Sequence, residues 1–228
     1  MSQSGGVLSD ALLVARKDLL LERRAKSGIG QVLPFAILVL LLFAFALDPD
    51  RGILKLATPG LFWVTVLFSA VLTLQRSFAL EAEDGILEAL RLSGMSPAGI
   101  YLGKVTALTI ELLLLEAVLV LGVAVLYDTK FLGIPLLFAI ALLATLGIAG
   151  AGAVYGALAA RLRSRETLLP LLLLPLLAPV LIAATRGCEV SLEREAMSGW
   201  PWAALLGIFA LVYLTLGSFL FRPLLEDA

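Results

Sequence analysis

Long apolar runs alternate with short polar segments along this chain, and the runs are long enough to predict membrane-spanning helices. A helix needs about 20 apolar residues to cross the hydrocarbon core of a bilayer. Six runs approach or exceed that length: residues 31–47, 58–75, 105–126, 132–160, 168–185 and 202–221. They are too long and too evenly apolar for the strands of a barrel. The pattern predicts an all-α integral membrane protein with six transmembrane helices in one domain, residues 1–228.

Composition supports this prediction. Of the 228 residues, 61% are hydrophobic and only 15% are charged, whereas a soluble domain is about a quarter charged. One compact core could not bury so much apolar surface, so the excess must face lipid. The net charge of −1 gives no overall basic balance that would indicate nucleic acid as a partner.

The distribution of Lys and Arg predicts the orientation of the spans. With a cytoplasmic N-terminus, twelve of the 17 basic residues fall in cytoplasmic segments. An excess of Lys and Arg marks the cytoplasmic side of a membrane protein. With six spans, we therefore expect both termini to lie in the cytoplasm.

The segment before the first run has the pattern of a helix that lies along the membrane surface. Ser9 is a candidate N-cap, and Ser27 with Gly28 forms a stop signal. Between them, Leu12, Ala15 and Leu19 fall on one face of a helix. We expect an interfacial helix that also serves as a positive anchor.

A charged segment, residues 81–97, separates the second and third runs. Its apolar residues share one face of a 3.6-residue helix and its charged residues the opposite face. Gly94 can end this helix, and Ser96 with Pro97 forms an N-cap and N1 pair for a new helix that leads into the third span. Periodicity alone also fits a solvated cytoplasmic connector.

Two acidic residues, Glu111 and Glu116, fall inside the third apolar run. A charged residue at the centre of a spanning helix costs about 2.5–3.5 kcal/mol. One interpretation is a polar contact or gate at a subunit interface. The other is one Glu that extends to the cytoplasmic interface and one that is buried and hydrogen-bonded.

Gly152 and Gly156 in the fourth run form a G-x-x-x-G pair, which predicts close helix packing. The fifth run contains Pro170, Pro175 and Pro179, which permit a hinge or shape a helix at a packed site. Beyond it, Ser191 is a candidate start of a short surface helix on the outer side.

The residues do not suggest an enzyme. Histidine is absent, so the commonest general base and metal ligand is missing. The segment "AGIYLGKV", residues 98–105, is not a P-loop, because Ala98 and Val105 replace the required Gly and Ser/Thr. We find no nucleophile–base set and no metal ligand group, and a lone cysteine, Cys188, is a weak redox signal.

Several motifs occur together in a known order. They are "TPGLFWV" at residues 58–64, "EDGILEAL" at 83–90, "GKV" at 103–105 and the proline-rich "LPLLLLPLLAPVLIAAT" at 169–185. Together they resemble the B subunit family of the cytochrome c maturation haem exporter. The acidic-Gly-x-Leu-Glu-x-Leu piece is shared with other ABC-type export permeases, whereas PG-x-x-W and the prolines are typical of this family.

The resemblance implies an ABC-2-type permease subunit, in the bacterial inner membrane, that works in cytochrome c maturation. Its partners would be a separate ATPase subunit, a haem-handling membrane protein, a haem chaperone and a second copy of itself. ATP use in the family is linked to release of the haem-loaded chaperone. Residues 81–97 would then form a cytoplasmic coupling helix that docks on the ATPase. The coupling residues would be Glu83, Asp84, Gly85, Leu87, Glu88, Leu90 and Arg91.

Haem itself is expected to be held by partners, so that this chain binds no cofactor. Strong haem ligation needs His, Met, Cys or Tyr, and this chain offers only Cys188, Met197 and a few tyrosines in no paired arrangement. Three alternatives stay open at this point: a generic ABC-2-type exporter permease for a lipid or drug, a scaffold subunit without ATPase contact, and a membrane enzyme.

Overall fold

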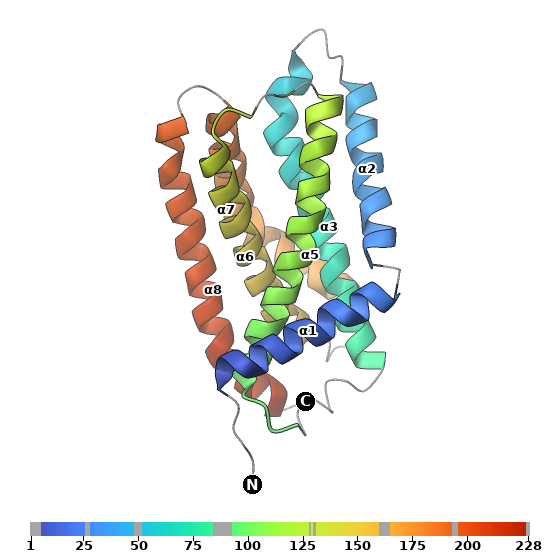
Figure 1. Ribbon diagram of the computed structural model, residues 1–228, viewed down its shortest axis with the longest axis vertical. Coiled ribbons are helices and arrows are strands. Elements are labelled where there is room, and N and C mark those ends of the chain that lie inside the picture. The colour runs from blue at the N-terminus through green and yellow to red at the C-terminus, as the bar shows by residue number, and fades with distance from the viewer. Residues whose placement is uncertain are drawn as a thin grey trace.

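The computed structural model describes residues 6–25, 28–47, 52–83, 93–127, 129, 131–159, 165–192 and 196–226. Every regular element in these ranges is a helix (Figure 1). The α-helices are α1 (Val7–Ala25), α2 (Gly28–Ala46), α3 (Ile53–Glu83), α5 (Pro97–Leu126), α6 (Ile134–Ala159), α7 (Arg165–Leu192) and α8 (Trp200–Glu226). A 3₁₀ turn, η2 (Ala196–Gly199), precedes α8.

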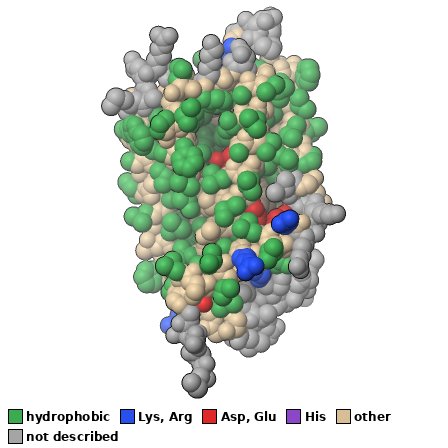
Figure 2. Space-filling model, in the orientation of Figure 1, with side chains coloured by type: hydrophobic (Ala, Val, Ile, Leu, Met, Phe, Trp, Pro, Cys, Tyr) green, Lys and Arg blue, Asp and Glu red, His purple; other side chains and the backbone are tan. Residues whose placement is uncertain are grey.

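Five of these helices, α3, α5, α6, α7 and α8, are long and apolar enough to cross a membrane. The apolar part of α2, Gly30–Ala46, is shorter than the others. The outer surface of the bundle is rich in hydrophobic side chains, with Phe45 88% and Val125 81% exposed (Figure 2). Such a surface is stable only in contact with lipid or protein, so the chain is a multi-pass membrane protein.

The long axis of the bundle is followed by α2, α3, α5, α6, α7 and α8, while α1 crosses the bundle at one end (Figure 1). In this view α1 passes in front of α5 and α3, and it packs mainly on α5. The C-terminal end of α8 lies at the same end of the bundle as α1. We call it the α1 end.

Sequence signals placed some boundaries correctly and missed others. Ser96 caps α5 as predicted: its Oγ accepts a hydrogen bond from the backbone N–H of Gly99, and Pro97 begins the helix. Gly94 has a φ of +72°, which suits glycine and separates the preceding segment from α5.

Two predicted helix starts are wrong. Ser9 lies inside α1, which begins at Val7, and its Oγ donates to the carbonyl of Gly6. Ser191 lies near the end of α7, where its Oγ donates to the carbonyl of Cys188. In both cases the hydroxyl bonds to a carbonyl three residues earlier, which is compatible with a helix that continues through the serine.

Small residues allow α6 to approach its neighbours closely. A Cβ on Gly152 would collide with Leu74, and one on Gly156 with the ring of Phe78, both on α3. On the other side, the buried Tyr101 of α5 donates its hydroxyl to the carbonyl of Tyr213 on α8 at 2.8 Å. These contacts hold α6 against α3 and α5 against α8.

Candidate functional site

The α1 end of α5 lies directly beneath the surface helix α1. Asp10 of α1 accepts two hydrogen bonds from Ser96, from its backbone N–H at 2.9 Å and from its Oγ at 2.8 Å. Ser96 therefore caps α5 and holds α1 at the same time. Because the acceptor is a carboxylate, these bonds are stronger than neutral ones.

Two glycines let the backbones of α1 and α5 meet. A Cβ on Gly99 would come within 2.6 Å of the Asp10 Cβ, and one on Gly103 within 2.6 Å of the Ala11 carbonyl oxygen. Real Cβ atoms do not approach other atoms so closely, so both positions require glycine for this packing. On α1 the buried face is formed by Asp10, Val14 and Ala15. Leu12, predicted to share a face with Ala15, is 72% exposed.

A lysine is buried where α1, α3 and α5 meet. Lys104 of α5 is 1% exposed; its Nζ lies 4.0 Å from Asp18 Oδ2 on α1 and 4.6 Å from the centroid of the Phe78 ring on α3. Both distances suit an ion pair and a cation–π contact. A buried charge needs such partners, because its desolvation is costly.

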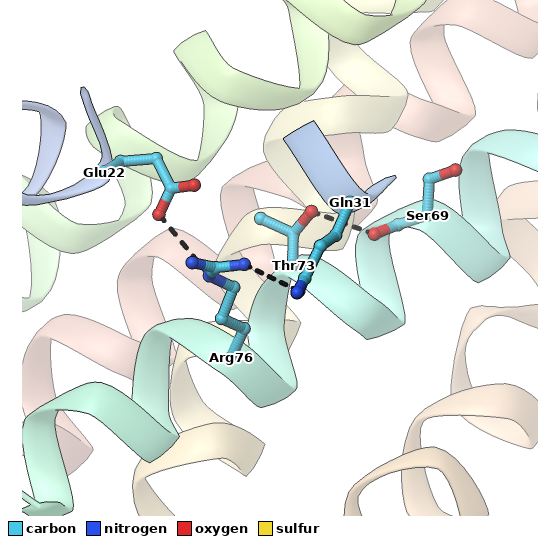
Figure 3. A network of polar contacts seen from close by, with 5 residues as sticks. All are labelled: Glu22, Gln31, Ser69, Thr73 and Arg76. Atoms are coloured by element: carbon cyan, nitrogen blue, oxygen red, sulfur yellow. Dashed lines mark hydrogen bonds and ion pairs between the residues drawn. The ribbon is translucent and has the colours of Figure 1, made fainter. Parts of the chain in front are cut away.

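A second polar contact ties α1 to α2 and α3 (Figure 3). Arg76 of α3 lies with its Nε 4.0 Å from Glu22 Oε2 on α1, and its NH1 donates to Gln31 Oε1 on α2 at 2.9 Å. One turn earlier, Thr73 donates its hydroxyl to the carbonyl of Ser69 within α3. We call Asp10, Asp18, Glu22, Arg76, Ser96 and Lys104 the α1 junction.

The predicted coupling segment, residues 81–97, overlaps the ends of two helices that contact α1 at the α1 junction. Residues 81–83 belong to α3, which ends at Glu83, and Pro97 begins α5. Asp84, Gly85, Leu87, Glu88, Leu90 and Arg91 lie outside the described residues, and for Glu83 only its place at the end of α3 is described. The coupling role of these residues stays a prediction.

The two intramembrane acids differ in their surroundings. Glu111 is partly exposed on α5, whereas Glu116 is 3% exposed and accepts a hydrogen bond from Thr145 Oγ1 of α6 at 2.5 Å. This arrangement matches the interpretation in which one acid is buried and hydrogen-bonded. Their role in gating stays a prediction.

The predicted hinge prolines lie within a continuous α7. Pro175 and Pro179 are exposed and Pro170 is partly exposed. Cys188 is a buried free thiol near the end of the same helix. Among the described residues, no three His, Cys, Asp or Glu side chains come together as a metal site.

Sequence reasoning missed most of the α1 junction. In the sequence, Arg76 contributes only to the orientation of the spans, and Lys104 to that orientation and to the "GKV" motif. Asp10, Asp18 and Glu22 carry no prediction. A signal was present: Gly99 and Gly103 form a G-x-x-x-G pair at the start of α5, which is typical of close helix contact.

The fold and the α1 junction define a class: a multi-pass membrane protein, helical in its described ranges, in which polar contacts join the crossing helix α1 to α3 and α5. The sequence model of the family described as CcmB protein matches residues 9–226. The chain belongs to this family.

Curated relatives agree with the family match. Heme exporter protein B of Paracoccus denitrificans (strain Pd 1222) is 36% identical over 208 residues, which cover 90% of this chain and 92% of the relative. Heme exporter protein B of Pseudomonas aeruginosa (strain PAO1) is 35% identical over 202 residues, 88% of this chain and 90% of the relative. The protein of the same name from Escherichia coli (strain K12) is 31% identical over 208 residues, which cover 90% of this chain and 93% of the relative.

Proposed function

We propose that this chain is the membrane permease subunit of an ABC-type complex for cytochrome c maturation. The family match and the relatives named heme exporter protein B support this role. In the proposal, a separate ATPase subunit hydrolyses ATP, and this chain passes the resulting movement to the haem-handling partners. The chain itself carries out no catalysis and holds no cofactor.

The α1 junction is the observation that carries the proposed mechanism. Ser96 and Lys104 tie the start of α5 to α1, and Arg76 ties the end of α3 to the same helix. A force applied to residues 84–92 between them would therefore move α1, α3 and α5 together, as a rigid body. Glu83, Asp84, Glu88 and Arg91 would face the ATPase, while Leu87 and Leu90 would seat the coupling helix on the membrane domain.

The proposal includes a topology of six spans in the bacterial inner membrane. It counts α2 as a span together with α3, α5, α6, α7 and α8, and it places α1 on the cytoplasmic surface. The common location of α1 and the end of α8 supports placing both termini on one side (Figure 1). The prolines of α7 would permit bending when α3 and α5 move, because α7 packs on α3.

Charge reversal in the coupling segment tests the mechanism. Glu88→Lys should lower the yield of mature cytochrome c at least tenfold, while the complex assembles and continues to hydrolyse ATP. Glu189→Lys is the matched control, because Glu189 is an exposed acid paired with Arg186 on α7. Unchanged maturation with Glu88→Lys would contradict the coupling role.

Purification of the tagged chain separates the alternatives. Recovery of an ATPase together with a haem chaperone supports the proposal. An ATPase without the chaperone indicates a generic ABC-2-type exporter for a lipid or drug, and absence of the ATPase indicates a scaffold. The subunit alone should show no stoichiometric haem absorption, and a clean bis-ligated Soret band would show that it binds haem itself.

A further inference from the structure

A cavity of about 500 Å³ lies between α3, α5, α6 and α7. Its walls come from the start of α3, the second half of α5, the first half of α6 and the end of α7. These parts lie toward the end of the bundle opposite α1 (Figure 1). The volume falls in the range of about 300–1,000 Å³ that is usual for small-molecule sites.

The cavity is lined mainly by apolar side chains and is reached from the lipid-facing surface. Phe62, Val123 and Ile140 are buried in its wall, whereas Ile134 and Phe138 are also widely exposed on the outside. Figure 2 shows a hollow in the apolar surface, within which an acidic side chain is visible between hydrophobic ones. A molecule dissolved in the bilayer could enter by this side without passing through water.

Four lining side chains carry a polar group: Thr58 and Trp63 of α3, Glu116 of α5 and Cys188 of α7. The hydroxyl of Thr58 already donates to the carbonyl of Leu54, whereas Glu116 and Trp63 each keep a polar atom without a partner in the described part of the chain. Glu116 uses Oε1 to accept from Thr145, but its Oε2 has no hydrogen-bond partner among the described residues. The same holds for Nε1 of Trp63, which is 2% exposed. Buried polar atoms in native proteins are nearly always paired, because an unpaired one costs about 1–3 kcal/mol. The two unpaired atoms belong to side chains that line the same cavity, so an occupant of the cavity is a candidate partner for both.

The two atoms restrict the chemistry of that partner. The indole Nε1–H only donates, so it needs an acceptor oxygen, and a carboxyl oxygen can accept from a hydroxyl. A hydroxyl group can satisfy both, since it has one donor and two lone pairs. The terminal torsion of a Glu side chain is soft, so a small rotation can present Oε2 to an occupant.

The charge of the occupant is restricted as well. A cation would pay a large desolvation cost on its way through lipid, and an anion would meet the carboxyl group of Glu116. A neutral molecule avoids both costs. Its hydrocarbon part matches the apolar remainder of the wall, including Leu137 and Phe138.

We propose that this cavity binds a neutral, membrane-soluble alcohol, whose hydroxyl group bonds to Glu116 and Trp63 and whose hydrocarbon part fills the space between α5 and α6. This site is separate from the α1 junction and does not depend on the proposed function. In this proposal Trp63, which belongs to the "TPGLFWV" motif, contacts the ligand.

Tryptophan fluorescence provides the test. The chain has three tryptophans, so a Trp200→Phe, Trp202→Phe variant leaves Trp63 as the only indole. The full chain is reconstituted in phosphatidylcholine vesicles and titrated with 2-bromododecan-1-ol or with 2-bromododecane, which lacks the hydroxyl group. Bromine next to the indole quenches its emission. We expect saturable quenching by the alcohol, with half-saturation at about a tenfold lower membrane concentration than for the bromoalkane.

Two substitutions connect the quenching to the cavity. Glu116→Leu should abolish the preference for the alcohol, and Ala141→Phe, which fills the cavity from α6, should abolish saturable quenching. Val125→Phe, on the exposed surface of α5, should change neither. If Glu116→Leu does not fold, as judged by circular dichroism and gel filtration, the test rests on Ala141→Phe. Loss of saturable quenching in that variant then supports the proposal, and saturable quenching that persists contradicts it.

Three results would overturn the proposal. Equal and linear quenching by both probes would indicate partition into the bilayer only. A preference that persists in both cavity variants would place the alcohol elsewhere. No quenching by either probe would mean that the cavity is closed to lipid-soluble molecules, as it would be if a second copy or a partner helix covered it.

Discussion

Ser96 Oγ lies 2.8 Å from Asp10 Oδ2, and this hydrogen bond joins the first helix of the chain to the cap of a spanning helix 86 residues later. The same Oγ accepts from the Gly99 N–H at 3.2 Å. The Ser96 side chain therefore caps the N-terminus of α5 and also positions α1. This relationship fixes the downstream end of the segment that we propose to receive the ATPase.

Removing this carboxylate should loosen α1. Asp10→Ala deletes the acceptor of two charge-assisted hydrogen bonds, from the N–H and the Oγ of Ser96. We expect a loss of roughly 2 kcal/mol in the free energy of unfolding, measured by denaturant titration in detergent. We also expect reduced cytochrome c maturation, because α5 would no longer move with α1.

The control for Asp10 is an exposed acid at the opposite end of the bundle. Glu189→Ala breaks the pair with Arg186, whose side chains are 42% and 60% exposed. Such a pair contributes about 0–1 kcal/mol, so the free energy of unfolding of this variant should remain close to that of the unsubstituted protein. If both variants lose the same free energy of unfolding, the Asp10–Ser96 contact stabilises the protein no more than an exposed ion pair does.

Steric fit at the crossing of α1 and α5 gives a second prediction. A Cβ at Gly103 would lie 2.6 Å from both the Ala11 carbonyl oxygen and the Val14 Cβ. Because the obstacle includes backbone, Gly103→Ala should destabilise the protein by about 1–3 kcal/mol. In Gly207→Ala, a Cβ would find Leu143 no nearer than 3.7 Å, and the gain in helix propensity should leave stability equal or higher.

Proteolysis reports the position of α1 in the same pair of variants. If Gly103→Ala displaces α1, limited trypsin digestion should cut at Arg16 or Arg23, which are exposed on α1, faster than in Gly207→Ala. Equal unfolding free energies and equal cleavage rates would mean that α1 tolerates a methyl group at the crossing.

Five apolar helices were predictable because burial in lipid imposes a long, uninterrupted apolar run that local sequence reports directly. The cap at Ser96 and the break at Gly94 were also predictable, since N-cap chemistry and a positive φ are local properties. Serines 9 and 191 failed as helix starts because the same hydroxyl also bonds to a carbonyl within a helix.

The α1 junction was not predictable in the same way. The buried face of α1 contains Asp10. Lys104 is also buried, although the distribution of Lys and Arg along the sequence indicates a cytoplasmic anchor at this position. Their burial depends on partners that lie 86 residues away in each case: Ser96 for Asp10, and Asp18 for Lys104. Hydrophobic periodicity assigns charged residues to an exposed face and cannot report such pairs.

A double-mutant cycle tests whether Lys104 and Asp18 act as a pair. Their charged atoms are 4.0 Å apart, and the side chains are 1% and 11% exposed, so water screens the pair weakly. Lys104→Met should destabilise the protein by about 1–2 kcal/mol, because Asp18 loses its pair with Lys104 but keeps the closer pair with Lys17 at 2.8 Å. Met fills a similar volume, so the effect should come mainly from charge rather than from packing.

Asp18→Asn completes the cycle, with unfolding free energies measured for both single variants and the double variant. We expect a coupling energy of about 1–2 kcal/mol, since contacting groups are not additive. The exposed pair Arg186–Glu189 should give less than about 1 kcal/mol in a parallel cycle. If the Lys104 and Asp18 effects add within about 0.5 kcal/mol, Lys104 would be stabilised by other contacts, such as the Phe78 ring, and α1 would not be tied to α5 at this point.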